Sequence, residues 1–435
     1  MEIIPKKLET VNREPLLIML SEILATGDEI LTGAVIDSNS AHIAQKLEEA
    51  GMEVVRHGCV GDDVEALASI LKEISTRADL SVVTGGLGPT IDDITAEAAA
   101  RAAGVELVFD QEAMSYIEDF LKTQGRDVIA SNKKQAILPK GSECLVNSVG
   151  TAPGFVLRIG RCIFFFLPGV PSEMRKMLSD GVLPWIDKLQ KGERSFNLVK
   201  TISTFGLAEA SVNERLAGLT EKFPGIKLGL RAKFPIIYVK LYIREKDKER
   251  ANILLENASE FVLNKIGEFA FSADGESMEA VVGGLFRREK ATIAVAESCT
   301  GGLISHLLTN VPGSSDYFLF SGVAYSNKAK IKVLGVSEAT LKECGAVHEE
   351  TVKQMADGAR RVAGATFGIS TSGIAGPGGG THEKPVGTVC IGIATPEAVE
   401  AYRFNFQFNQ RLRNKRIFAI TALDLLRRKL NPHFS

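Results

Sequence analysis

The sequence of 435 residues predicts two α/β modules joined by a small α+β domain. In residues 16–173 and 274–435, short apolar runs of strand length alternate with stretches whose apolar residues recur every three or four positions. This alternation is typical of a mostly parallel sheet with helices on both faces. Residues 174–273 separate the two modules and lack the glycine-rich loops and clustered acids found elsewhere. The first fifteen residues form an extension, so we expect domains at 16–173, 174–273 and 274–435.

In the first module, strands and helices are expected to alternate up to the first glycine-rich loop. They are a strand at 16–24, a helix at 38–50, a strand at 52–59, a helix at 63–75, a strand at 80–83 and a helix that starts near Thr95.

The middle and last modules are assigned from the same periodicities. In the middle module we expect strands at 200–205 and 236–243 and helices at 208–219 and 247–266. In the last module we expect helices at 277–289, 302–309, 348–363 and 409–430, and strands at 292–296, 320–325, 367–371 and 386–394.

Composition excludes several classes of protein. The net charge of −2 provides no general attraction to nucleic acid or to an acidic membrane surface. No apolar run approaches the roughly 20 residues that span a bilayer, and the N-terminus lacks the apolar core of a signal peptide, so we expect a cytoplasmic location. The six cysteines are scattered without a C-x-x-C pair, which argues against a disulfide framework or a zinc site.

The strongest signal in the first module is a glycine-rich loop at 84–93 that directly follows a strand. Gly85, Gly86 and Gly88 would let the backbone approach an anionic group closely. Asp92 and Asp93 could hold a magnesium-type cation that binds a phosphate. The alternative is a tight turn whose two acids cap the next helix. A second acid-bearing loop, which includes Asp28 and is followed by Asn39, would share the same rim.

In the last module, two glycine-rich loops follow strands. In the first, at 296–302, the hydroxyls of Ser298 and Thr300 and the backbone N–H groups of Gly301 and Gly302 suit an anion or an oxyanion. Cys299 is expected to be structural because no histidine is near it in sequence. The second loop, at 371–380, could cradle a phosphate or could be a flexible turn. Arg411 and Arg413 offer a phosphate contact further along the chain.

Ser315, Tyr325 and Lys330 lie between these two loops and combine a hydroxyl, a phenol and an amine. A desolvated lysine can take the proton of a serine, and a tyrosine could relay that proton or fix the lysine. Ser315 could therefore be a nucleophile with Tyr325 and Lys330 activating it, although residues of these types are common and their spacing alone favours a structural role. Two alternatives remain open. Tyr325 could be core and Lys330 part of a solvated helix face, or Ser314 and Lys328 could take the catalytic places.

These motifs together resemble the CinA family. Residues 16–180 are similar to the MoaB/MogA-type molybdopterin-binding fold through Gly-Asp-Glu-x-Leu-x-Gly and Thr-Gly-Gly-x-Gly-Pro-Thr-x-Asp-Asp. Residues 277–430 resemble the CinA C-terminal domain, also found alone as PncC, through Ala-Glu-Ser-Cys-Thr-Gly-Gly, Tyr-Ser-Asn-x-x-Lys and Ser-Gly-Ile-Ala-Gly-Pro. The middle segment is similar in position to a KH-type domain. It lacks the G-x-x-G clamp, so direct binding of nucleic acid is not expected.

The resemblance implies that the last module hydrolyses the amide of nicotinamide mononucleotide (NMN) to nicotinate mononucleotide and ammonia, without a cofactor. It implies that the first module cleaves ADP-ribose at its pyrophosphate with a divalent metal such as Mg²⁺, and that the chain forms a homodimer. The alternative is a first module that binds a pterin or nucleotide without turnover, in a competence- or damage-associated interaction protein.

The resemblance also assigns residues to these two sites, with Ser315 as the nucleophile of the amidase and Tyr325 and Lys330 activating it. The implied substrate-binding residues of the amidase are Glu297, Ser298, Thr300, Gly301, Gly302, Thr371, Ser372, Gly373, Gly376 and Arg411. The implied N-terminal site consists of Asp28, Glu29, Asn39, Thr84, Gly85, Gly86, Gly88, Pro89 and Thr90, with Asp92 and Asp93 for the metal.

Overall fold

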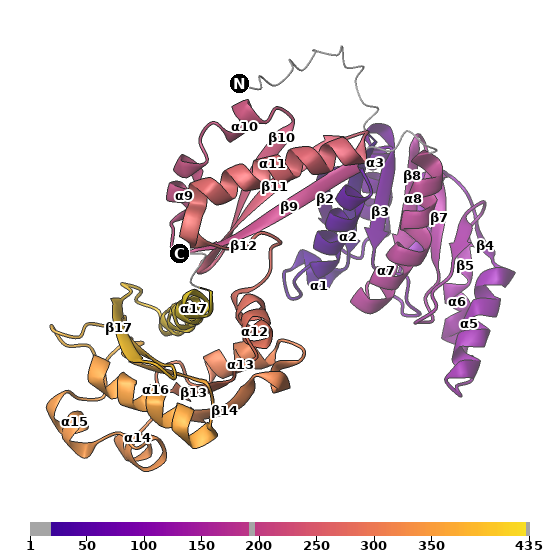
Figure 1. Cartoon of the computed structure of the whole chain (residues 1–435). Coiled ribbons are helices and arrows are strands. Elements are labelled where there is room, and N and C mark those ends of the chain that lie inside the picture. Colours follow the sequence, from indigo (N-terminus) through magenta and orange to yellow (C-terminus); the bar gives the residue numbers. More distant parts are fainter. Residues whose placement is uncertain (1–18, 191–195, 432–435) are drawn as a thin grey trace, which may run out of the picture. The chain divides into compact units, whose positions relative to one another are not determined.

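The computed structural model describes residues 19–190 and 196–431 (Figure 1). The expected N-terminal extension lies outside the described residues. The chain divides into two compact units. The first contains the chain up to Leu198 together with Arg244–Ala251, and the second contains Val199–Ile243 and the chain from Asn252 onward. No helix in the described part of the chain is both long enough and apolar enough to cross a membrane.

A six-stranded sheet forms the centre of the first unit. Its strand order is β2-β1-β3-β8-β7-β6. The first four strands are parallel to one another, and β7 runs antiparallel to both of its neighbours, β8 and β6. Two further strands, β4 and β5, pair beside it. The strands are β1 (Leu20–Thr26), β2 (Glu53–Val60), β3 (Leu80–Thr84), β4 (Leu107–Phe109), β5 (Ile137–Pro139), β6 (Glu143–Leu145), β7 (Gly154–Ile159) and β8 (Cys162–Leu167).

Helices cover both faces of this sheet, as the alternating pattern predicts. One apolar cluster joins α3, α4 and α5 to the sheet, and another joins α2, α7 and α8 to its other face. The helices are α1 (Asp28–Leu31), α2 (Ser38–Glu49), α3 (Val64–Arg77), α4 (Thr95–Ala103), α5 (Gln111–Thr123), α6 (Ala130–Gln135), α7 (Pro171–Met177), the π-helix η1 (Leu178–Val182) and α8 (Leu183–Gln190).

The predicted boundary at residue 173 is wrong. Met174, Met177 and Leu178 are buried in the same apolar cluster as Ile23 of β1 and Ile43 of α2. Residues 174–190 therefore continue the first module, because their apolar side chains complete the core on one face of its sheet.

The middle module contains a four-stranded sheet of order β10-β11-β9-β12. The expected helix at 208–219 is split: α9 ends before Gly218, whose φ of 83° is outside the helical range. The elements are β9 (Phe196–Phe205), α9 (Glu209–Arg215), α10 (Leu219–Lys222), β10 (Ile226–Lys233), β11 (Ile236–Glu245), α11 (Lys248–Ile266), the 3₁₀ helix η2 (Gly267–Phe269) and β12 (Ala270–Ser272).

The last module is built on a five-stranded sheet of order β14-β13-β15-β16-β17. Strands β14, β13 and β15 are parallel, and β16 and β17 run antiparallel to their neighbours. The strands are β13 (Ile293–Glu297), β14 (Phe318–Val323), β15 (Phe367–Gly373), β16 (Thr388–Ala394) and β17 (Val399–Asn405). The helices are α12 (Met278–Arg288), α13 (Leu303–Thr309), the 3₁₀ helix η3 (Ser314–Asp316), α14 (Asn327–Leu334), α15 (Glu338–Glu343), α16 (Glu349–Ala363) and α17 (Arg411–Leu430).

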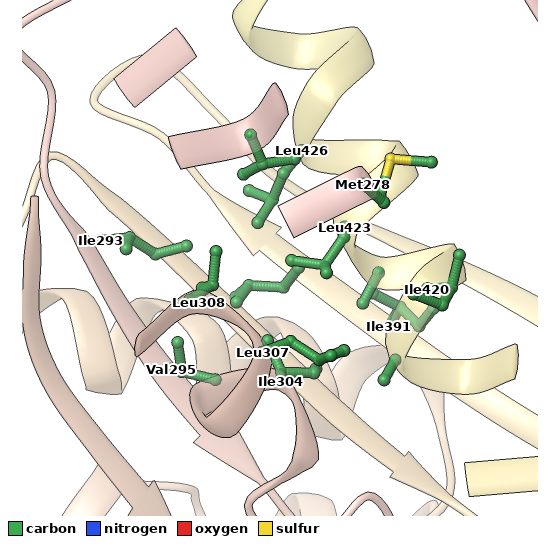
Figure 2. Close-up of a cluster of buried hydrophobic side chains, with 14 of the residues drawn as sticks. Met278, Ile293, Val295, Ile304, Leu307, Leu308, Ile391, Ile420, Leu423 and Leu426 are labelled. Carbon is green, nitrogen blue, oxygen red and sulfur yellow. The ribbon is translucent and has the colours of Figure 1, made fainter. Parts of the chain in front are cut away.

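Helix α17 supplies much of the core on one face of this sheet. Figure 2 shows Ile420, Leu423 and Leu426 of α17 facing side chains from α12, α13 and the strands. On the other face, α14 and α16 pack against the sheet through a second apolar cluster. The three parallel strands therefore end between two helical layers, and the loops after β13 and β15 lie at that shared edge.

Candidate active site

A buried lysine lies beside a serine hydroxyl at this edge of the last module. Lys330 of α14 is only 1% exposed, and its Nζ lies 3.2 Å from the Oγ of Ser298. The same Nζ donates to the carbonyl oxygens of Ala324 (2.8 Å) and Tyr325 (3.2 Å). Burial lowers the pKa of Lys330 because desolvation disfavours its ammonium form. The alternative of a solvated helix face is therefore wrong for Lys330, although Lys328 is exposed.

The structure does not bring Ser315 to Lys330, so the expected pairing of these residues is corrected. Ser315 is exposed in η3, directly before β14, whereas Lys330 binds carbonyls directly after β14. The six residues of β14 rise roughly 3.3 Å each, which separates the two ends of the strand by roughly 20 Å. Ser314 lies in the same short helix and is no better placed. The serine hydroxyl that contacts Lys330 is that of Ser298.

Tyr325 contacts the lysine through its backbone rather than through its phenol. Its side chain is 61% exposed, which contradicts the alternative that it belongs to the core. Its hydroxyl accepts a hydrogen bond of 3.1 Å from Arg411 Nη2. The phenol is thus placed to orient Arg411, and the carbonyl of Tyr325 helps to fix the amine of Lys330.

The carboxylate of Glu297 closes the loop that carries Ser298. It is fully buried and accepts hydrogen bonds from the backbone N–H groups of Gly302 (2.9 Å), Ile304 (3.2 Å) and Ser305 (2.9 Å). The hydroxyl of Ser305 donates to it at 2.6 Å. Four donors hold the negative charge in place at the start of α13. Glu297 therefore organises the loop from within.

The expectation that the N–H groups of Gly301 and Gly302 receive an anion is also corrected. Gly301 donates its N–H to the carbonyl of Ser298 at 3.1 Å, and Gly302 donates to Glu297. Both donors are used inside the loop. The φ angles of 61° and 91° at these two residues are in the left-handed range, so glycine is needed for this tight turn.

Thr300 and Thr371 lock the two glycine-rich loops together. Both are fully buried, and their hydroxyls share a hydrogen bond of 2.7 Å. Ser372 is buried next to Thr371 on β15, and Gly373 ends that strand. A Cβ at Gly373 would lie 2.6 Å from the carbonyl of Thr388, so glycine permits close approach of β16. These residues hold the edge of the sheet rigid.

The first turns of α17 bring positive charge to the same edge. Arg411 Nη1 donates to the carbonyl of Gly376 at 2.9 Å, which ties α17 to the second loop. Lys415 lies one turn further, and a Cβ at Gly301 would lie 3.2 Å from its Nζ. Lys415 was not predicted, although its spacing of four residues from Arg411 on one helix face is a signal that the sequence contains. Asn414 between them is buried and donates to the carbonyls of Ala375 and Phe408.

Cys299 is buried beside the pair, as expected for a structural residue. Burial raises the pKa of its thiol to about 12, so the nucleophilic thiolate is suppressed near neutral pH.

The first unit contains a separate cavity of about 550 Å³ at the carboxyl ends of its parallel strands. Every residue expected in the N-terminal site lines this cavity except Asp28. Those that line it are Glu29, Asn39, Thr84, Gly85, Gly86, Gly88, Pro89, Thr90, Asp92 and Asp93. Asp28 lies just outside, where its Oδ1 accepts from the N–H of Asp62 at 3.2 Å.

Asp62 is an acid of this cavity that the sequence reasoning missed. Burial is the main cause that raises the pKa of its carboxyl, and a hydrogen bond from the N–H of Asp28 opposes it. The negative charges of Asp28, Glu29 and Asp92 raise the pKa of Asp62 further. Crowded carboxylates of this kind bind a cation or a proton readily. Asp62 follows β2, so its position after a strand was the available signal.

One carboxylate oxygen of Asp93 accepts hydrogen bonds from within its own loop. Its Oδ2 accepts from the N–H of Thr90 at 2.7 Å and from the hydroxyl of Thr90 at 2.6 Å. Asp92 is exposed. Within residues 19–190 and 196–431, no three His, Cys, Asp or Glu side chains form a group that could hold a metal ion.

Two buried polar atoms at the cavity have no hydrogen-bond partner in the part of the chain that the structure describes. They are Oγ1 of Thr26 and Oδ1 of Asn39. Nδ2 of Asn39 is satisfied by Thr84 Oγ1 (3.1 Å) and by the carbonyl of Gly169 (2.8 Å), which fixes the amide. Buried polar groups are normally paired, so these two atoms are exceptions beside the cavity.

Three family models match the chain in succession. Residues 22–188 match the model described as "Probable molybdopterin binding domain", residues 199–272 match the "Damage-inducible protein CinA KH domain", and residues 275–430 match the "CinA C-terminal domain".

Whole-chain relatives carry the same family name. A CinA-like protein of Desulfosudis oleivorans is 55% identical over 95% of this chain and 100% of the relative. A CinA-like protein of Desulforapulum autotrophicum is 49% identical over 95% of this chain and 98% of the relative. The crystal structure of the competence/damage inducible protein CihA from Agrobacterium tumefaciens is 37% identical, with a TM-score of 0.34, over 35% of this chain and 93% of that chain.

The fold and the sites thus define a protein with a MoaB/MogA-like module, a KH domain and a CinA C-terminal domain. The chain belongs to the CinA family.

Proposed function

We propose that the last module is an amidohydrolase in which Ser298 is the nucleophile and Lys330 is its base. The observation that carries this proposal is the distance of 3.2 Å between Lys330 Nζ and Ser298 Oγ. It is supported by the burial of Lys330, which lowers the pKa of the amine toward a range where a neutral base is populated.

The contacts of Lys330 suit both protonation states of the amine. As an ammonium it donates three hydrogen bonds, to Ser298 Oγ and to the carbonyls of Ala324 and Tyr325. After loss of a proton, two N–H groups can still serve the two carbonyls, and the lone pair then faces Ser298. The base is thereby held in the orientation that proton transfer requires.

In the proposed reaction, neutral Lys330 takes the proton of Ser298 as Oγ attacks the carboxamide carbon. The tetrahedral intermediate collapses, the C–N bond breaks, and Lys330 returns the proton to the leaving ammonia. Water then attacks the acyl carbon and gives a proton to Lys330. The C–Oγ bond breaks, Lys330 returns the proton to Oγ of Ser298, and the carboxylic acid leaves.

The proposed substrate is NMN, the amide implied by the resemblance to the PncC type. Its 5′-phosphate would be recognised by the cations of Arg411 and Lys415, which lie one turn apart on α17. Arg411 is held by Gly376 and Tyr325, so its position is fixed before the substrate binds. The site residues other than Ser298 and Lys330 would therefore bind and orient the nucleotide.

The direct test is ammonia release from NMN by the full chain in the presence of a metal chelator, with a search for an acyl group on the peptide that contains Ser298. Release of ammonia together with an acylated Ser298 supports the proposal. Release of ammonia with the acyl group on another residue contradicts the assignment of Ser298.

We propose a second activity, the cleavage of the ADP-ribose pyrophosphate, for the cavity of the first unit. It is supported by the crowded acids around Asp62 and by the glycine-rich loop that lines the same cavity. Asp62 and Asp92 would hold a divalent cation, which would neutralise the charge that develops on the diphosphate. Mg²⁺ commonly uses one or two carboxylates with substrate phosphates, so this small ligand set fits it.

The other candidate for this cavity is binding of a pterin or nucleotide without turnover, favoured by the match to a molybdopterin-binding model. Incubation of the chain with ADP-ribose and Mg²⁺ distinguishes the two. Formation of AMP and ribose phosphate supports cleavage, whereas saturable binding without products supports the binding role. The proposed homodimer is tested by light scattering of the purified chain.

A further inference from the structure

A cavity of about 710 Å³ lies in the second unit, away from the serine–lysine pair. It is lined by the end of β9, the β10–β11 hairpin, β17 with the loop after it, and α17, and it opens to solvent. Five phenylalanine side chains line it: Phe205, Phe234, Phe404, Phe406 and Phe408. A volume of this size is typical of sites for small organic ligands, and aromatic walls favour a flat apolar ring.

One cation of this cavity has no acidic partner. The guanidinium carbon of Arg413 lies 4.4 Å from the ring centre of Phe234 and 5.0 Å from that of Phe408. Among residues 19–190 and 196–431, no ion pair of Arg413 with a carboxylate is formed. Its charge therefore remains available to an anion that enters the cavity.

The other charged groups of the cavity do not neutralise Arg413. Asp424 lines the cavity as well, but its Oδ2 binds Arg428 at 2.8 Å and its Oδ1 binds Arg427 at 2.8 Å. Glu209, in the first turn of α9, also lines the cavity, but it is exposed and forms no ion pair with Arg413 in the part of the chain that the structure describes. The cavity thus combines aromatic walls with one uncompensated positive charge.

Helix geometry separates this cavity from the amidase site. Arg411 and Arg413 are two positions apart on α17, which turns their side chains about 200° from each other. Arg411 contacts Gly376 and Tyr325, whereas Arg413 lies over Phe234 and Phe408. The two arginines therefore serve different sites on opposite sides of one helix.

We propose that this cavity binds a small molecule that combines an aromatic ring with an anionic group. The ring lies among the phenylalanines and the anion pairs with Arg413. This inference does not depend on the proposed amidase activity.

Two related fluorophores test it on the full chain. 1-Anilinonaphthalene-8-sulfonate carries the anion, and N-phenyl-1-naphthylamine is the same ring system without the sulfonate. Both should bind with saturation. Arg413→Met should weaken binding of the sulfonate by about tenfold, which corresponds to the loss of about 1.4 kcal/mol. It should leave binding of the neutral dye within a factor of two.

Two further variants locate the binding. Ala232→Trp places a large ring in the cavity from an exposed position on β10 and should abolish binding of both dyes. Arg361→Met removes an exposed arginine of α16 that does not line the cavity and should change neither. Thermal melts of each variant show whether it is folded.

Three outcomes overturn the proposal. Sulfonate binding that survives Ala232→Trp places the dye elsewhere, and equal weakening of both dyes by Arg413→Met removes the role of the charge. The third outcome is a wild-type chain that binds neither dye and is an oligomer by light scattering, together with an Ala232→Trp variant that is a monomer. A second copy of the chain would then fill this cavity.

Discussion

The amine of Lys330 and the hydroxyl of Ser298 are 32 positions apart in sequence and 3.2 Å apart in space. The parallel pairing of β13 with β14 produces this contact, since Ser298 follows β13 and Lys330 binds the carbonyls that follow β14. The proposed nucleophile and its proposed base are thus contributed by two neighbouring strand ends. The following predictions test this pair and the groups that hold it.

Ser298→Ala should reduce ammonia release from NMN by at least about a thousandfold, because the variant has no oxygen to form the acyl-enzyme. Ser315→Ala is the matched control, since it removes the same atom from an exposed serine at the other end of β14. It should keep wild-type rates. Loss of activity in Ser315→Ala with retention in Ser298→Ala would reverse our correction. The measurement is a coupled ammonia assay on both variants.

The pH dependence of kcat/KM should report the neutral form of Lys330. Since burial lowers its pKa, the rate should rise with pH and level off above an apparent pKa that is lower than the ordinary value of 10.5. Lys330→Arg should lose at least about a hundredfold, because arginine stays protonated. A rate that is independent of pH from 5 to 10 would argue against a lysine base.

The free energy of unfolding should also depend on the titration of Lys330. Between the lowered pKa of Lys330 and 10.5, the unfolded chain binds a proton that the folded chain does not, so wild-type stability should rise with pH in that window. Lys330→Met removes this contribution. The difference in melting temperature between the variant and the wild type should therefore shift in favour of the wild type as pH rises.

Glu297→Gln should destabilise the loop that carries Ser298. The amide loses one acceptor oxygen and brings N–H groups toward backbone donors that the carboxylate now satisfies. We expect a loss of about 3 kcal/mol in the free energy of unfolding and a loss of ammonia release. Glu343→Gln, at an exposed position of α15, is the control and should change neither. The free energy of unfolding of both variants is measured by denaturant titration. An unchanged value for Glu297→Gln would contradict the role of the carboxylate.

Asp62→Asn should abolish ADP-ribose cleavage while leaving ammonia release from NMN unchanged. The substitution removes a carboxylate that is crowded by Asp28, Glu29 and Asp92. Asp127→Asn is an exposed control outside the cavity. Product formation from each substrate should be followed by chromatography. Loss of both activities in a folded Asp62→Asn chain would argue against two independent sites.

The periodicity of the sequence predicted the architecture well because each strand and helix has its own apolar pattern. The strands at 80–83 and 292–296 and the helix at 348–363 were placed within two residues of β3, β13 and α16. The boundary at 173 was wrong because Met174 and Met177 form an ordinary helical pattern that cannot reveal which sheet it packs on.

The sequence predicted which residues lie at the candidate site, but not which serine contacts Lys330. Ser298, Lys330 and Arg411 were all selected from their motifs, yet proximity in sequence favoured Ser315 as the partner of Lys330. The strand between Ser315 and Lys330 places them at opposite ends of a sheet, whereas the contact of Lys330 with Ser298 depends on the pairing of β13 with β14, which no local pattern encodes. Likewise, the hydrogen bond from the Gly302 N–H to Glu297 could not be predicted, because it depends on how the loop folds back on itself.

Helix α17 has a consequence for how the protein matures. It is the last element that the structure describes, and it holds Arg411, one wall of the aromatic cavity and a large share of the core shown in Figure 2. During translation the ribosome finishes α17 after every other described element of the second unit. A nascent chain that already contains Ser298 and Lys330 would therefore lack this helix, so that the proposed hydrolysis would start only once the synthesis of α17 is finished.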